Sequence, residues 1–447
     1  MAIDRRSVLG LSAGGAAGAM LPTPGRATPV PLGSLGLDVT HFGVNPSGPD
    51  DQTEALQRAI DASAEARVPL WLPAGTYIAG DLLLPSGAQL FGIRGATRLM
   101  LGHGASIVAS SRADQVTLQG LVFDGRDQFI PKGRGLITLR NTRGVRILDC
   151  YIQESDGAGI ALIGVEGEVA HTTIIGAAKG GIHAIDSRGL VISNNTVFNC
   201  AGSGITVSRA QRGDDGTQLT GNRIEQIRAA GDDARGNGIV ALRAANVIAA
   251  DNRIRHCAAS AVHAVEASNL HVRGNAAGAI GGIAILAEGG LEGAVISGNS
   301  VDGAGGGISV ADRAQNGRLV VCQGNLVRNL RRGNPVAGHG IGIAVEADSA
   351  ITGNVIEGAP LAGILAGFGK NLRDVTVTGN VVRTAPIGIG VSATPGAGSA
   401  LVAHNLIAGA TTGAVMGMED GKAVTGDLAR DETSRFAHIT VSGNRVR

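Results

Sequence analysis

The stretch LVISNNTVFNCAGSGITVS, residues 190–208, decides the fold. It contains two short runs of alternating apolar residues on either side of a doubled Asn, and a third run after a Gly-rich bend. Alternation with a period of two is typical of β-strands, and runs this short, bounded by Gly and Asn, are unsuited to helices. The stretch therefore predicts three short strands joined by tight turns.

The same pattern recurs along the chain, with one Asn in each copy. The steps between consecutive Asn are 23 to 30 residues, followed by a final step of 39. Asn tolerates the left-handed backbone of a tight turn, and stacked amides can hydrogen-bond along a column. We therefore expect these residues to form a ladder. Its members are Asn195, Asn222, Asn252, Asn275, Asn299, Asn325, Asn354, Asn380, Asn405 and Asn444.

A repeat of this length cannot bury its inward side chains alone, so successive copies must stack. The repeat predicts an all-β fold, a right-handed parallel β-helix of about a dozen coils, with its coils over residues 101–417. The aromatic content of 2% and the 71 Gly fit a thin lattice of aliphatic residues. Because the formal net charge is only +1, we expect no nucleic-acid partner.

Residues 38–100 are predicted to cap the N-terminal end of the β-helix. The segment PDDQTEALQRAIDASAEA (49–66) predicts an amphipathic helix that opens with a capping box from Asp51 to Glu54. Such a helix would cover the open edge of the first coil. At the other end, the polar residues of 418–447 predict an arm and a last coil. The expected buried face of the helix is Ala55, Leu56, Ala59, Ile60 and Ser63.

The four cysteines do not suggest a disulfide framework. Cys200 and Cys257 each follow a ladder Asn by five residues, which places them in one column two coils apart. At a coil rise of about 4.8 Å they would be about 10 Å apart, beyond disulfide reach. We therefore expect these two, together with Cys150 and Cys322, to be small buried hydrophobic residues.

The first 27 residues resemble a twin-arginine export signal. Arg5 and Arg6 precede one spacer and two apolar residues, and a weakly apolar Ala/Gly run follows, with small residues for cleavage near Ala27. This run is too short to span a bilayer. We expect the twin-arginine machinery as a partner, a periplasmic or extracellular location, and no stable membrane span after cleavage.

The segments HFGVNPSGPDDQTEALQRAIDAS (41–63) and LWLPAGTYIAGDLLLPSGAQLFG (70–92) resemble the N-terminal signature of the pectate-lyase superfamily of right-handed β-helices. Together with the leader and the Asn-Gly coils, they make the chain similar to exported β-helix repeat proteins of that superfamily. The resemblance is specific for the fold. It leaves the chemistry open, because the superfamily includes lyases, hydrolases, epimerases and non-catalytic adhesins.

The resemblance implies that a substrate would lie along the sheet formed by the Gly-Ile-x-Val strands and their flanking turns. Arg pairs well with uronate carboxylates, and β-elimination needs a base at C5 and a cation beside the carboxylate. The predicted catalytic residues on this sheet are Lys179, His183, Arg209, Arg243 and His263. The predicted substrate-binding residues are Asp156, Asp186, Asp232, Asp233 and Glu266.

Other interpretations of these residues stay open. The charged column that contains Arg209, Arg243 and Glu266 equally suits a surface ladder, whose exposed pairs contribute about 0.2–1 kcal/mol each. The strings GDD and GHG resemble motifs of polygalacturonase-like hydrolases, but Asp232 and His339 would lie about 19 Å apart. The Asp-Pro-His-Asp string typical of alginate epimerases is absent from the sequence. The scarcity of aromatic residues disfavours a neutral glycan.

The sequence thus predicts an exported β-helix protein that binds or processes an anionic, uronate-type polysaccharide, with β-elimination as the candidate reaction. A non-catalytic structural or binding β-helix of the cell envelope is one alternative, and a glycoside hydrolase is the other. The sequence contains no organic-cofactor motif and leaves the binding of Ca²⁺, the identity of the glycan and the oligomeric state open.

Overall fold

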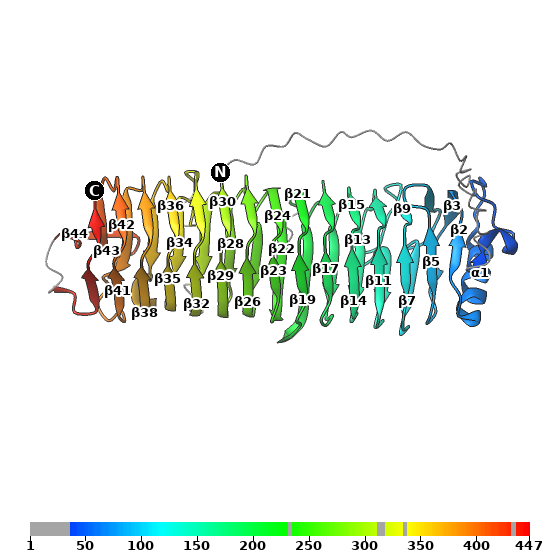
Figure 1. Cartoon of the computed structure of the whole chain (residues 1–447), viewed down its shortest axis with the longest axis horizontal. Coiled ribbons are helices and arrows are strands. Elements are labelled where there is room, and N and C mark those ends of the chain that lie inside the picture. The colour runs from blue at the N-terminus through cyan, green and yellow to red at the C-terminus, as the bar shows by residue number, and fades with distance from the viewer. Residues whose placement is uncertain (1–35, 231–234, 311–317, 334–337, 431–434) are drawn as a thin grey trace, which may run out of the picture.

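The computed structural model describes residues 36–230, 235–310, 318–333, 338–430 and 435–447. These residues form a single row of stacked coils, with the helix α1 (Thr53–Ala66) at one end and the strands β43 (Gly413–Glu419) and β44 (Lys422–Asp427) at the other (Figure 1). The architecture is an all-β, right-handed parallel β-solenoid of about 13 turns. The fold class predicted from the repeat is therefore confirmed.

Each coil contributes three strands, and each strand pairs in parallel with its equivalent on the next coil. The first column contains the Gly-Ile-x-Val strands. The second column contains the strands before the ladder Asn and their equivalents on the first coils, and runs from β1 (Leu37–Asp38) to β45 (Ile439–Ser442). These two columns belong to one 31-stranded sheet. The third column holds the strands after the Asn and forms a separate 15-stranded sheet, from β3 (Gly75–Ala79) to β46 (Arg445–Val446).

The strands that matter below lie in the middle of the first and third columns. In the first column they are β13 (Ala158–Ile163), β16 (Gly180–Ile185), β19 (Ser203–Asp214), β22 (Asn237–Ala245), β25 (Val262–Val265) and β28 (Ile283–Glu288). In the third column they are β21 (Arg223–Ile227), β24 (Arg253–Cys257), β27 (Ala276–Gly278), β30 (Ser300–Asp302), β33 (Leu326–Arg328) and β36 (Val355–Glu357).

The Asn ladder is present and buried. From Asn195 to Asn405, each Nδ2 donates to the Oδ1 of the next Asn along the column at 2.9–3.1 Å. The expectation that the Asn itself would be left-handed is wrong, because the positive φ belongs to the residue before it. That residue is Gly in seven coils, and it is Asn194, Asp251 or His404 in the other three. Gly suits this position because it adopts a positive φ without steric cost.

Register in the first column follows the sequence up to His263 and then differs from the expectation. Sequence alternation alone aligns His263 with Ala284, whereas the structure pairs it with Leu286. Ile283 and Ile285 are two residues apart, so an alternation of period two cannot choose between them. The consequence is that Glu288 pairs with Val265 and lies one coil from His263.

The N-terminal helix buries the expected face, with Leu56, Ala59, Ile60 and Ser63 inside and Ala55 partly buried. The predicted capping box is wrong. The N-cap residue is Gln52, whose Oε1 accepts a hydrogen bond from the backbone of Asn45 instead, while Asp51 accepts from the Thr53 amide at 3.0 Å.

The four cysteines are buried, as expected. Burial raises the pKa of the thiols of Cys150, Cys257 and Cys322 to about 12 and that of Cys200 to about 11. At the C-terminal end, β44, which lies within the segment 418–447 predicted as an arm, pairs in antiparallel fashion with β43. Across the described residues, no helix combines the length and apolar character that crossing a membrane requires.

Candidate functional site

A hollow of about 470 Å³ lies over the first column of strands, between β16 and β28. Its position on the Gly-Ile-x-Val strands is the one expected from the sequence. The side chains that give it chemical character come from successive coils of the β-helix. They are Lys179, His183, Arg235, Asn237, His263 and Glu288.

His263 is held between side chains of the two neighbouring coils. It is 7% exposed, and its Nε2 lies 2.8 Å from Glu288 Oε1. Its Nδ1 lies 3.5 Å from Asn237 Nδ2, while Asn237 Oδ1 accepts a hydrogen bond from the Ser260 amide at 3.0 Å. Because an amide nitrogen only donates, these partners assign the proton to Nε2, which donates to Glu288. We call this arrangement the His263–Glu288 pair.

His183 lies at the other end of the hollow and depends on a neighbouring glycine. A Cβ atom at Gly180 would come within 2.1 Å of His183 Nε2, so a side chain there would force the His183 ring out of its present position. Gly180 also has a φ of +139°. Burial lowers the pKa of His183, and a hydrogen bond with the backbone of Lys179 acts in the opposite direction. The net effect favours the unprotonated ring at neutral pH, which is the state that can accept a proton.

Two cationic side chains lie at the rim of the hollow. Lys179 precedes β16 and Arg235 precedes β22, and both residues are exposed. Glu288 carries the one carboxylate among the described residues that line the hollow. The arrangement thus combines an unprotonated histidine, a histidine bonded to a carboxylate, and two exposed cations.

The charged column of the sequence analysis has a different environment. Four residues of β19, 209–212, stand where β22 has only Arg243, so β19 has three extra residues and the chain bulges outward there. The bulge is bonded to each neighbouring charged residue: Asp186 accepts from the Ala210 amide at 2.8 Å, and Glu266 lies 3.5 Å from Arg212. Arg243 Nε donates to the Arg209 carbonyl oxygen at 2.8 Å.

The side chain of Arg209 points into the wall of the β-helix, where it is 15% exposed. It donates to the Ser187 carbonyl oxygen at 3.0 Å, and its Nη1 lies 3.7 Å from Asp215 Oδ2, an ion pair too long for a hydrogen bond. Burial raises the pKa of Asp215, while hydrogen bonds from Thr217 and the charge of Arg209 lower it in part.

None of Asp186, Arg209, Arg243 and Glu266 lines the hollow. Their role in ligand binding stays a prediction. Asp156 accepts a hydrogen bond from the Ile130 amide at 3.4 Å and also lies away from the hollow. Two further predicted residues, Asp232 and Asp233, lie outside the described residues.

Of the six side chains that give the hollow its chemical character, three were absent from the predicted set, namely Arg235, Asn237 and Glu288. Glu288 reaches the hollow only because of the register at Ile283 and Ile285 described above, which the sequence alternation could not decide. Asn237 stands directly before the Gly-Ile pair of its coil, and that position was a usable signal for a side chain at the start of the strand. Within the described ranges, no group of three or more His, Cys, Asp or Glu side chains is arranged to hold a metal ion.

This chain belongs to the right-handed β-helix family. The family model, described as the right handed beta helix region, matches residues 103–277, 158–319 and 212–382. The N-terminal part, residues 36–98, matches a second model described as rhamnogalacturonase A/epimerase, pectate lyase-like. A comparison with curated proteins gave no match.

Several solved structures have a similar fold at low sequence identity. The pre-mature gene product 12 of bacteriophage phi29 aligns with a TM-score of 0.56 at 15% identity, over 89% of this chain, which spans 58% of the phage protein. The A-module of a mannuronan C-5 epimerase from Azotobacter vinelandii aligns with a TM-score of 0.52 at 16% identity, covering 92% of this chain and 99% of the module.

The catalytic unit of a thermostable α-1,3-glucanase from Streptomyces thermodiastaticus gives a TM-score of 0.52 at 16% identity, covering 92% of this chain and 68% of the glucanase unit. At these identities the likeness establishes the fold alone.

Proposed function

We propose that the chain binds and processes an anionic, uronate-type polysaccharide at the hollow between His183 and His263. The observation that supports this most is the convergence of His183, the His263–Glu288 pair and two rim cations on one hollow. The fold is compatible with such a function, because a mannuronan epimerase module and a glucanase unit have similar folds.

The residues fit proton abstraction next to a carboxylate. In β-elimination a base removes the proton at C5 of the uronate, the C4–O bond breaks, and the leaving oxygen takes up a proton. His183 is the base that the geometry favours, because its pKa is lowered. Lys179 and Arg235 can pair with the uronate carboxylate and stabilise the charge that develops beside it. Epimerisation would begin with the same proton abstraction.

Hydrolysis is less well supported. Glycoside hydrolysis uses two carboxyl groups on either side of the scissile bond. Among the described lining residues, Glu288 alone has a carboxyl group, and His263 already donates to it at 2.8 Å. The other alternative is a groove that binds the polymer without turnover. The experiment described next distinguishes this alternative from catalysis.

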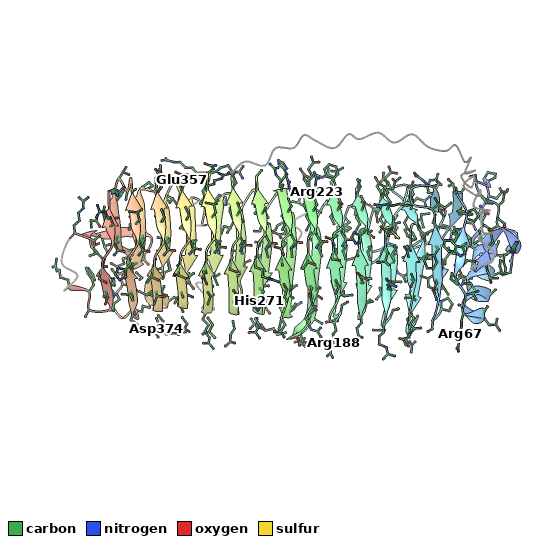
Figure 2. All side chains as sticks on the ribbon, in the orientation of Figure 1. Arg67, Arg188, Arg223, His271, Glu357 and Asp374 are labelled. Carbon is green, nitrogen blue, oxygen red and sulfur yellow. The ribbon has the colours of Figure 1, made fainter. Side chains whose placement is uncertain are left out.

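The test uses the purified mature protein with polygalacturonate and with alginate. We expect ultraviolet absorbance from an unsaturated uronate product, together with loss of activity in His183→Ala and His263→Gln. The matched control is His271→Ala, because His271 is an exposed histidine of β26 (Ser268–Arg273) that does not line the hollow (Figure 2).

New reducing ends without unsaturation would indicate hydrolysis, and a change in sugar configuration without chain cleavage would indicate epimerisation. Binding that depends on His183 but gives no product would support the non-catalytic alternative. If neither polymer binds or reacts, the proposed function is wrong.

Export by the twin-arginine route is part of the same proposal, supported by Arg5 and Arg6 and the apolar run after them. Replacing both by Lys should leave the precursor in the cytoplasm. Unchanged export of that variant would contradict the proposed periplasmic or extracellular location.

A further inference from the structure

A second hollow, of about 630 Å³, lies on the third column of strands and is separate from the candidate site. Its floor is β27, whose outward positions are Ala276 and Gly278. The neighbouring coils carry larger side chains at the same register, because Arg253 pairs with Ala276 and Arg255 pairs with Gly278. One coil with minimal side chains therefore leaves a groove between its neighbours. We call it the arginine hollow.

Figure 2 shows Arg223 of β21 and Glu357 of β36 at one long edge of the molecule, the edge at which Figure 1 labels the strands of the third column. The arginine hollow lies between these two residues along that edge, over β24, β27, β30 and β33. It shares no lining residue with the candidate site.

The lining is strongly cationic. It contains four guanidinium groups, from Arg253, Arg255, Arg328 and Arg331, and one carboxylate, from Asp302. That carboxylate already accepts hydrogen bonds from Arg328 at 2.8 and 3.1 Å and from Asn329 Nδ2 at 2.8 Å.

Two of the arginines, Arg253 and Arg255, form no close ion pair within the described residues. Glu225, which pairs with Arg255 by register, is bonded to Arg223 at 3.0 Å, so it interacts with Arg255 only through space, as Asp302 does. A Cβ atom at Gly278 would lie 3.4 Å from Arg255 Nε, which places the Arg255 side chain across the floor of the hollow. Unpaired guanidinium groups that converge on a hollow are suited to bidentate binding of an oxyanion.

We propose that the arginine hollow binds an anionic glycan through its carboxylate or sulfate groups. A glycan is favoured over single-stranded nucleic acid because no aromatic side chain lines the hollow, and nucleic-acid grooves combine basic residues with rings on which bases stack. The proposal does not rest on the function proposed for the His183–His263 hollow, so either can fail without the other.

The test compares two changes that disturb the arginine hollow in different ways. Arg253→Gln with Arg255→Gln removes both unpaired charges. Gly278→Leu fills the hollow and leaves the net charge unchanged. The register supports tolerance of a large residue there, because Ile175 and Phe198 occupy the same column on earlier coils. Circular dichroism and thermal unfolding confirm that each variant is folded.

The matched control is Arg143→Gln with Arg383→Gln, which removes the same charge from exposed arginines outside the hollow. Calorimetric titration with a heparin oligosaccharide and with an oligogalacturonate, each at low and high salt, measures the affinity. Dextran is the neutral probe and oligothymidylate is the nucleic-acid probe. Each titration is repeated in the His183→Ala background, so that binding at the other hollow is removed.

We expect at least one anionic oligosaccharide to bind, with about a tenfold loss of affinity in Arg253→Gln/Arg255→Gln and a comparable loss in Gly278→Leu. The control variant should stay within about twofold. An equal loss of affinity in the control variant would show that binding depends only on the overall charge of the protein, and would overturn the proposal. The proposal is also wrong if neither anionic oligosaccharide binds. It is equally wrong if oligothymidylate binds as tightly as the oligosaccharides and loses as much affinity in Gly278→Leu.

Discussion

The Nε atom of Arg243 donates a hydrogen bond to the main-chain carbonyl oxygen of Arg209 at 2.8 Å, across neighbouring coils. This contact is one of several that hold the bulge 209–212 of β19 against the body of the β-helix. Arg212 extends the same set of contacts across further coils, since its Nη2 donates to the Gly289 carbonyl oxygen at 2.7 Å. The charged side chains beside the bulge therefore help to hold it against the neighbouring coils.

Arg243→Ala should loosen the bulge without unfolding the β-helix. Loss of one hydrogen bond costs about 1 kcal/mol, so amide exchange in residues 209–213 should become about fivefold faster. Arg273→Ala is the control, because Arg273 is exposed and its side chain has no hydrogen bond or ion pair within the described residues. Equal exchange rates in the two variants would show that Arg243 does not hold the bulge.

The buried carboxyl of Asp215 should make stability depend on pH in an unusual direction. Its side chain is 0% exposed and burial raises its pKa, so the folded state retains a proton that the unfolded chain releases near pH 4. Its contribution to stability is therefore complete at low pH and declines as the pH rises through the raised pKa.

Asp215→Asn removes this titration. The difference in unfolding free energy between the variant and the wild type should shift in favour of the variant as the pH rises above about 4, by at most about 1.4 kcal/mol per pH unit. Urea denaturation at a series of pH values measures it. A difference that stays constant with pH for Asp215→Asn would show that the folded and unfolded chains bind this proton equally, so that the pKa of Asp215 is not raised.

The fold was predictable because the sequence pattern of one coil is local and is repeated in every coil. The site depends instead on the register of β28 and on the insertion at 209–212 in β19. The ladder Asn recur with similar spacing, so an error in any single coil hardly affects the fold class. Glu288 was misplaced because Ile283 and Ile285 fit the alternation equally well. The outward path of residues 209–212 follows from contacts with Asp186, Arg243 and Glu266, and no local pattern encodes it.

Interior ladder Asn should matter more than terminal ones. Asn299 accepts ladder bonds from Asn275, donates ladder bonds to Asn325, and also donates to the Val272 carbonyl oxygen at 2.9 Å, whereas Asn444 has a ladder neighbour only at Asn405. Asn299→Ala leaves buried hydrogen-bonding partners unsatisfied and should lower the free energy of unfolding by about 2–4 kcal/mol. Asn444 is only half-buried, so Asn444→Ala should lower it by about 1–2 kcal/mol. Chemical denaturation measures both, and equal costs would contradict a cooperative ladder.

His183 should set the acidic limit of turnover at a lower pH than an ordinary histidine would. Burial lowers its pKa below the usual value of about 6.5, so the unprotonated ring persists into mildly acidic solution. If His183 is the base, turnover of polygalacturonate or alginate should hold down to pH 6.5 and decline only below it. His183→Ala should lose about 10²–10⁴-fold in rate, and its residual activity should lack this acidic limb, while the exposed His271→Ala should keep both rate and profile.

Stability gives an independent measure of the same group. Because the folded pKa is lowered, the contribution of His183 is complete above about pH 6.5 and is lost as the pH falls from there towards the folded value. His183→Ala should therefore show a flatter stability profile over that interval in chemical denaturation, whether or not the polymer is turned over. An acidic limb of activity that begins above pH 6.5, or that survives unchanged in His183→Ala, would assign the base to another residue.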